Sequence, residues 1–414
     1  MNRRGFLAGL GAAGCSAAAF PWLSTVTLAG APGGVLGNNR LVVVILRGAL
    51  DGLDLVQPLG DPDFAAARPS LGTGEGTHDL DGFFGLHARM GALMPLWAAG
   101  ELAFVHAAST PYRDKRSHFD GQDLLEAGTG MDVPIGFRKE GWLNRMLQAV
   151  PGLAAETAFA VGREAMPLLS GRAPTLSWAP EQRLPLSAQG RLLLEHLYHD
   201  DALFREAAEG AMALSTGTEG TDDDADGAES MAAGAPGEGM EAPASGRVAD
   251  VDALAAFAAE RLRAETRIAT FSLSGWDTHR DQATTLVAPL QRLERIVLRL
   301  RGDLGADVWG RTVLVAMTEF GRTVRENGSR GTDHGTGGTV LLAGGALRGG
   351  RVLGRWPGLD EAALYDRRDL MPTSDVRLWA AGAMRGLFGL DAGVLAGAVF
   401  PGLDAADGLP DFLL

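Results

Sequence analysis

Side chains that bind metal ions or anions gather at a few points along this chain of 414 residues. The densest group lies between Arg311 and Gly345, and the others come directly after apolar runs. Carboxylate and imidazole groups without a thiolate suit Zn, Mn, Mg or Ca, and imidazole favours Zn or Mn over the harder ions. We therefore expect one shared site for a divalent metal, with Zn, Mn or Ca as the cofactor. Its candidate ligands are Asp51, Asp54, His118, Asp277, His279, Glu319, Asp333 and His334.

Three further residues are candidates for catalysis at such a site. Ser117 stands where a helix is expected to begin, and the free backbone N–H groups and dipole of a helix favour an anionic ester there. A metal ion lowers the pKa of a hydroxyl that it coordinates, which would make Ser117 a nucleophile. Arg47 and Arg322 are candidates to hold the anion, because a guanidinium can donate two parallel hydrogen bonds, and Arg113 and Arg116 are further candidates for that role.

Single members of this set also have structural interpretations. Asp51 or Asp54 could stabilise the turn that follows a strand. Ser117 could be the N-cap of its helix, and Asp277 with His279 could form a local side-chain pair. The shared site is favoured by the set as a whole rather than by any one residue.

Apolar runs alternate with helical patterns along the chain. Six runs predict strands because they are short, continuous and rich in apolar residues, several of them β-branched. They are Leu41–Leu46, Leu102–Ala107, Ala158–Val161, Ile268–Leu273, Thr312–Met317 and Thr339–Ala343. This alternation indicates an α/β fold, with a mostly parallel sheet and helices on both faces. The candidate ligands follow the strands, so the ends of the strands would bring them to one edge of the sheet.

Composition limits the partners and the architecture. A formal net charge of -14 argues against nucleic acid, because binding it depends on Lys and Arg. Hydrophobic residues make up 46% of the chain, enough for a large core in a single domain over residues 40–414. Residues 216–247 hold almost no bulky apolar side chains and predict a disordered acidic loop, rich in Gly and Ala, within that domain.

The N-terminus predicts an export signal over residues 1–31. Arg3 and Arg4 precede Phe-Leu and an apolar run, as in a twin-arginine signal peptide, and cleavage is expected after Ala31. The only cysteine, Cys15, lies in this segment, so the mature protein would have no disulfide and no thiolate ligand. We expect a periplasmic or extracellular protein that meets the twin-arginine translocase during export and has no membrane span after cleavage.

Several motifs in this order closely resemble the DUF1501 family. They are LRGALDGLD, RSHFDG, GWDTH, TEFGRT and GTDHG, after the twin-arginine start. The family is grouped with the alkaline phosphatase and sulfatase superfamily. The resemblance implies a three-layer α/β sandwich of the alkaline phosphatase kind, a hydrolase-like two-metal site, and a Ser or Thr nucleophile near the second strand.

The superfamily pattern can be carried onto single residues. Asp51 looks like the acid that bridges the metals, and Ser117 lies in the region of the nucleophile. Asp277 with His279 resembles the metal-binding Asp and His pair, at a shorter spacing than usual, and His334 resembles the last metal-binding histidine.

One departure falls after the next strand, where an Asp-His pair is usual. Glu319 replaces the Asp and Phe320 replaces the His. Either His118 or Asp333 substitutes for that ligand, or one metal binds, or catalysis is lost.

These observations lead to two functional hypotheses. The first is an exported metal-dependent hydrolase of phosphate or sulfate esters, with Ser117 as nucleophile and a small anionic ester or a cell-surface polymer as substrate. The alternative is a non-catalytic periplasmic binding or assembly protein that keeps the fold and a structural metal.

Overall fold

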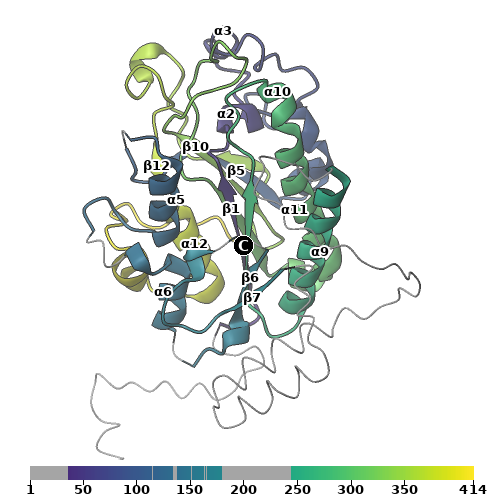
Figure 1. The fold of residues 1–414 in the computed structure, drawn as a ribbon, viewed down its shortest axis with the longest axis vertical. Coiled ribbons are helices and arrows are strands. Elements are labelled where there is room, and N and C mark those ends of the chain that lie inside the picture. Colours follow the sequence, from purple (N-terminus) through teal and green to yellow (C-terminus); the bar gives the residue numbers. More distant parts are fainter. Residues whose placement is uncertain are drawn as a thin grey trace, which may run out of the picture. The chain divides into compact units, whose positions relative to one another are not determined.

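A sheet of nine strands organises the unit Asn39–Leu414 of the computed structural model (Figure 1). The structure describes residues 36–113, 115–133, 138–150, 152–162, 164, 166–179 and 244–414. The order across the sheet is β11-β5-β10-β9-β1-β8-β6-β7, and β12 also pairs with β5. The strands are β1 (Arg40–Arg47), β5 (Leu102–Ser109), β6 (Ala158–Val161), β7 (Leu176–Trp178), β8 (Ile268–Ser274), β9 (Thr312–Met317), β10 (Gly338–Ala343), β11 (Arg351–Leu353) and β12 (Ser374–Asp375).

All pairings in this sheet are parallel except those of β10, which runs antiparallel to both β5 and β9. The predicted α/β class with a mostly parallel sheet is therefore confirmed. The antiparallel β10 was not predicted, because a buried apolar run reads the same in either direction.

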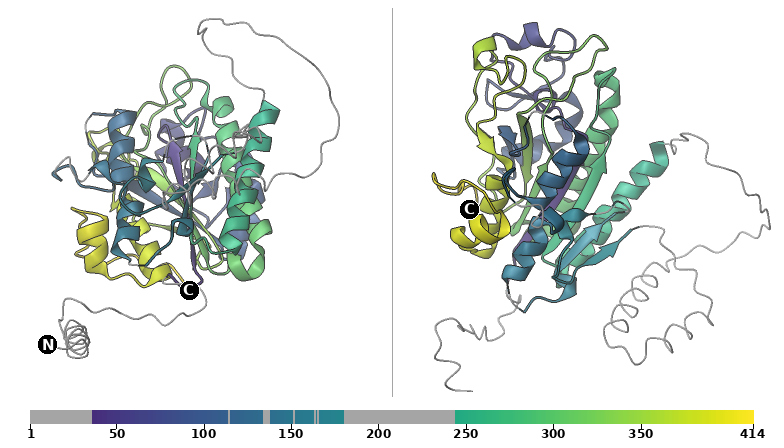
Figure 2. Two further views of the ribbon diagram at one scale, coloured as in Figure 1. Left: turned by 60° about the horizontal axis from the view of Figure 1, so that its bottom comes forward. Right: turned by 60° about the vertical axis from the view of Figure 1, so that its left-hand side comes forward.

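Helices cover both faces of the sheet, which explains why its central strands are apolar on both sides. On one side lie α9 (Ala244–Arg263) and α11 (Val287–Trp309), which contact β6, β8 and β9. On the other lie α5 (His118–Ala127), α6 (Trp142–Ala149) and α12 (Val376–Phe388), and α12 contacts β1 and β9. The views in Figure 2 show the green α9–α11 pair and the yellow C-terminal helices on opposite sides.

Shorter elements complete the unit. The short helices are α2 (Gly52–Leu55), α3 (Phe64–Ala67), α4 (Met94–Ala98), α10 (Gln282–Thr285) and α13 (Ala392–Val394). Short helical segments of three to six residues cover Ala88–Leu93, Ala155–Thr157, Pro167–Leu169, Glu361–Ala363 and Leu395–Val399. A second sheet has the order β2-β4-β3, from β2 (Val56–Gln57), β3 (His78–Asp79) and β4 (Gly85–Leu86).

Two predicted segments fall largely outside the described residues. The signal peptide over 1–31 lies outside them, and so do residues 216–243 of the predicted disordered loop. The last four residues of that prediction, 244–247, belong to α9 and are helical, so the predicted loop was too long at its C-terminal end. Within the described part of the chain, no helix is both long and apolar enough to cross a membrane.

The strand directions bring four loops to one edge of the sheet. Strands β5, β9, β1 and β8 all end at this edge, and β10 begins there because it is antiparallel. The β9–β10 connection therefore starts and finishes at the same edge. This arrangement is what allows residues from five neighbouring strands to share one site.

The exits of β1 and β8 approach each other so closely that only glycine fits at position 48. Gly48 has a φ of 118°, and a Cβ built there would lie 2.7 Å from the backbone nitrogen of Asp277.

We predict that Gly48→Ala lowers the free energy of unfolding by about 2–4 kcal/mol, from backbone strain and overpacking. Chemical denaturation measures the change. Gly389→Ala is the matched control, because Gly389 also has a positive φ but has no atom within 4 Å of the added Cβ. It should cost only about 1 kcal/mol, and an equal loss in both variants would contradict the close approach at Gly48.

Candidate metal centre

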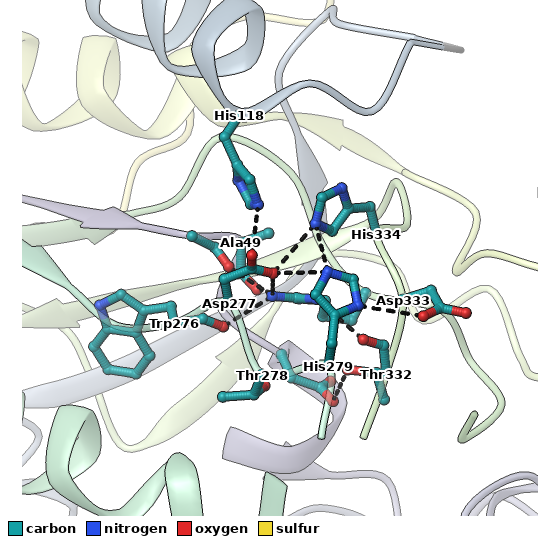
Figure 3. Close-up of polar contacts among 12 residues, drawn as sticks. Ala49, His118, Trp276, Asp277, Thr278, His279, Thr332, Asp333 and His334 are labelled. Carbon is teal, nitrogen blue, oxygen red and sulfur yellow. Dashed lines mark hydrogen bonds and ion pairs between the residues drawn. The ribbon is translucent and has the colours of Figure 1, made fainter. Parts of the chain in front are cut away.

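Three imidazole rings and one carboxylate converge at the edge of the sheet described above (Figure 3). The Oδ1 atom of Asp277 lies 3.0 Å from Nε2 of His279 and 3.2 Å from Nε2 of His334. Its Oδ2 atom lies 3.4 Å from Nε2 of His118. The ligand atoms of His118, Asp277 and His334 are all within 4.8 Å of one another, so one metal ion could contact all three.

The three rings come from three separate segments of the chain. His118 is the first residue of α5, and Ser117 before it is the N-cap. Asp277 and His279 follow β8 at a spacing of two, and the buried Thr278 between them faces away from the site to bond Gln282. His334 lies in the β9–β10 connection, four residues before β10 begins.

The second nitrogen of each ring lies beside an acceptor. The Nδ1 atoms of His118, His279 and His334 lie 2.8, 3.3 and 2.9 Å from Oε1 of Glu319, Oδ1 of Asp333 and the carbonyl oxygen of Arg116. An acceptor at Nδ1 fixes the proton there and leaves the Nε2 lone pair for a metal, which is the usual arrangement of histidine ligands.

The Nε2 atoms are placed to bind a cation rather than to hydrogen-bond to one another. Nε2 of His279 and Nε2 of His334 are 2.9 Å apart, and two such atoms with protonated Nδ1 positions have no proton to share. Nε2 of His118 is buried and lies 3.4 Å from Oδ2 of Asp277, a contact that does not meet the geometry of a hydrogen bond. A divalent cation among these atoms would supply a closer partner.

Charge in the site favours a cation as well. Burial alone would raise the pKa of Asp277, but His118, His334 and Arg322 outweigh burial and hold that pKa far below its usual range. Asp277 and Glu319 raise the pKa of His118 to about 9 because they stabilise the imidazolium. A metal ion would take the place of that proton.

Arg322 fastens the loops that carry these ligands, and its side chain is fully buried. Nε donates to the carbonyl of Ala49 at 2.8 Å, and Nη1 donates to the carbonyl of Thr332 at 3.1 Å. Nη2 reaches the carbonyls of Gly48 and Trp276 at 2.8 and 3.0 Å and Oδ1 of Asp277 at 2.5 Å. We predicted that Arg322 would hold a substrate anion. Its guanidinium is instead buried and bonded to protein groups.

Glu319 is placed to orient His118 rather than to bind the metal. Its Oε1 atom accepts from the backbone N–H groups of Gly48 and Ala49 at 2.9 and 3.2 Å and from Gln122 at 3.1 Å, besides His118. Hydrogen bonds, above all from His118, hold the pKa of Glu319 low although burial would raise it. The carboxylate of Glu319 is thus ionised and accepts these four hydrogen bonds.

Arg47 supports Glu319 indirectly, through Gln122. Its Nη1 atom donates to Gln122 at 3.0 Å and lies 2.7 Å from Glu126, while Nε donates to Ser272 at 2.6 Å. These contacts tie Arg47 to protein groups, which differs from the predicted role in holding the substrate.

Asp51 and Asp54 form a separate buried cluster. Arg68 binds Asp51 with two N–H groups, at 2.7 and 3.1 Å, where the superfamily pattern implied a metal. Burial opposes ionisation of Asp51, but Arg68 overcomes it and the pKa of Asp51 is lowered. Burial and the neighbouring Asp51 raise the pKa of Asp54 to about 6. The superfamily pattern implied that Asp51 bridges two metal ions. In the structure Asp51 binds the guanidinium of Arg68 instead.

Gln282 links this cluster to the ligand loops. Its Nε2 atom donates to Asp51 at 2.6 Å and to Asp54 at 2.8 Å. Its Oε1 atom accepts from Thr278 at 2.9 Å and from Thr332 at 2.8 Å. Each threonine is next to a residue of the site. Gln282 therefore fixes both ligand loops relative to Asp51 and Asp54, which follow β1.

Phe320 forms the apolar wall of the site. Its ring stacks on His118 with centroids 5.2 Å apart, on Tyr112 at 6.0 Å, and lies 5.3 Å from His334. The position that the superfamily pattern gives to a histidine therefore packs against the histidines of this site.

Arg116 was a candidate to hold the anion, but several other supporting residues were not predicted, namely Arg68, Gln122, Gln282, Thr332 and Asn327, which donates to Asp333. Their partners are mostly distant in sequence, so local spacing carries no signal for them. Arg68 shows one weak indication: it is an arginine in a stretch with Phe64 and Leu71, where burial is compatible with a paired guanidinium.

A comparison with family models places the chain among known proteins. The family described as "Protein of unknown function (DUF1501)" matches residues 108–379, which is more than half of the chain and holds His118, Asp277, His279 and His334. No match was found among the curated proteins, and none among the solved structures.

We predict one bound metal ion per chain, because Arg68 already neutralises the acid that a second ion would need. Elemental analysis after loading with Zn or Mn and removal of excess metal measures the ratio. His118→Ala should lose most of the metal. His78→Ala should keep it, because His78 belongs to β3 of the second sheet and its Nε2 atom contacts the carbonyl of Ala88. Two ions per chain in the wild type, or an unchanged ratio in His118→Ala, would contradict the assignment.

Proposed function

Since the chain belongs to the DUF1501 family, whose description gives no function, we propose from the site that it is a metal-dependent hydrolase of phosphate or sulfate esters. The observation that carries the proposal is the convergence of three Nε2 atoms on Asp277, with each Nδ1 beside an acceptor. A site prepared for a cation in this way suits hydrolysis of an anionic ester. We also propose that the sheet is of the alkaline phosphatase kind, with one metal in place of two.

The residues divide the work between them. His118, Asp277, His279 and His334 would hold the metal, and Glu319, Asp333 and the carbonyl of Arg116 would keep the rings oriented. A bound divalent ion would supply Lewis-acid polarisation of an ester oxygen. Phe320 would exclude water from one side of the site.

Ser117 is the proposed nucleophile. Its Oγ accepts a long hydrogen bond of 3.5 Å from the backbone N–H of Asp120, a contact that uses an oxygen lone pair and not the hydroxyl proton. As Oγ bonds to phosphorus or sulfur, Ser117 would lose that proton and the leaving alcohol would take one up. Water would then release phosphate or sulfate and restore the hydroxyl.

A second candidate function is a non-catalytic binding or assembly protein that keeps the metal. Two observations favour it: Phe320 packs where the superfamily pattern has a ligand, and Arg47 and Arg322 bond to protein groups. Turnover distinguishes the two proposals, because only the hydrolase needs the Ser117 hydroxyl.

We predict that the metal-loaded protein hydrolyses at least one member of a panel of phosphate and sulfate esters. Ser117→Ala should lower kcat/KM by about a thousandfold or more. Ser117→Gly tests the same hydroxyl at little cost to the helix, because glycine is accepted at an N-cap. Ser329→Ala, on an exposed loop, is the control and should leave the rate unchanged. Metal binding without turnover by the wild type would favour the second candidate.

We propose periplasmic or extracellular localisation from Arg3 and Arg4, which lie outside the described residues. Replacing both with Lys keeps the charge but removes the twin-arginine pair. We expect the variant to stay in the cytoplasm while the wild type is exported, as measured by cell fractionation. Equal export of the two proteins would contradict the proposal.

A further inference from the structure

Two partly exposed arginines contact His334. The carbonyl of Arg116 accepts the Nδ1–H of His334, and Nη1 of Arg368 donates to the carbonyl of His334 at 3.0 Å. The arginine pair, Arg116 and Arg368, thus adjoins the candidate metal centre.

One buried acid anchors both members of the arginine pair. Asp369 is fully buried, and its Oδ2 atom lies 3.5 Å from Nη2 of Arg116 and accepts from Thr336 at 2.9 Å. Its Oδ1 atom accepts from Nη1 of Arg368 at 3.0 Å. One carboxylate between two guanidiniums leaves a net charge of one positive unit at the surface.

The anchoring leaves most donors of the pair unused. The side chain of Arg116 is 37% exposed and that of Arg368 is 35% exposed. Within the described residues, Nε and Nη2 of Arg368 and Nε and Nη1 of Arg116 make no hydrogen bond. In Arg322, by contrast, Nε, Nη1 and Nη2 all donate to protein acceptors. A side chain that recognises an anion must be held in place and still have N–H groups to offer, and the arginine pair meets both conditions.

The backbone gives an independent indication. Arg116 has a φ of 53°, in the left-handed region that favours glycine. Strained conformations of this kind persist where the surrounding structure fixes them, and they gather at ligand-binding sites. Here the strain accompanies a carbonyl turned toward His334 and a side chain turned toward Asp369.

We propose that the arginine pair binds the outer oxygens of a tetrahedral oxyanion, a phosphoryl or sulfuryl group, while another oxygen faces the candidate metal centre. The assignment rests on the proposed function and adds the residues that recognise its substrate. Two guanidinium forks beside a cation call for at least three oxygen atoms on one centre. Phosphate and sulfate provide these, and a carboxylate provides only two.

The test is calorimetric binding of inorganic phosphate and, separately, of sulfate to zinc-loaded protein. Arg116→Gln and Arg368→Gln should each weaken binding by about tenfold or more, because each removes charge-assisted hydrogen bonds. Arg299→Gln is the matched control: it removes the same charge from a half-exposed arginine paired with Asp303 on α11, and its affinity should match the wild type. Tighter binding of phosphate than of sulfate would assign a phosphoryl substrate, and the reverse a sulfuryl substrate.

Zinc content is measured on every sample, so that the two proposals fail separately. Wild type without zinc would overturn the proposed function. Wild type that holds zinc but binds neither oxyanion, or Gln variants with unchanged affinity, would overturn the role of the arginine pair alone. A Gln variant that loses zinc is replaced by the Arg→Lys variant, which keeps the charge and loses the fork. Unchanged affinity in that variant would also overturn the proposal.

Discussion

The buried guanidinium of Arg322 is the constraint on which the candidate metal centre depends. It binds the ends of β1 and β8 and the β9–β10 connection through four carbonyls and one carboxylate. Desolvating a guanidinium is unfavourable unless its donors are satisfied, so these loops must keep the positions that provide the acceptors. Asp277 belongs to the set, and its place fixes where the histidine rings can meet.

A second layer of charge fixes the rings themselves. Glu319 and Asp333 lie beside the Nδ1 atoms of His118 and His279, and the buried Asp51–Arg68 pair supports the same loops through Gln282 and Thr332. Each acid is matched by a donor, and the Nε2 atoms of the three rings are directed toward Asp277. Orienting groups of this kind raise the affinity of histidine for a metal and set its geometry.

The sequence was informative where local pattern decides the outcome. Thr312–Met317 and Ala158–Val161 are strands with the predicted bounds, and Ser117 caps a helix as one interpretation proposed. The candidate ligands followed strands, and four of the eight converge. The burial of two arginines could not be predicted: nothing near Arg322 in the sequence indicates that its guanidinium is enclosed, and the apolar neighbours of Arg68 give only a weak indication. The antiparallel β10 was equally hidden, because strand direction depends on pairing between distant segments.

The central claim is that three histidines and Asp277 bind one divalent ion. The most direct measurement is X-ray absorption spectroscopy of the zinc-loaded protein, followed by anomalous diffraction from its crystals. We expect one zinc ion, bonded at about 2.0–2.2 Å to Nε2 of His118, His279 and His334 and to a carboxylate oxygen of Asp277. A zinc ion bound to Asp51 or Asp54, or no bound zinc in a folded protein, would contradict the account.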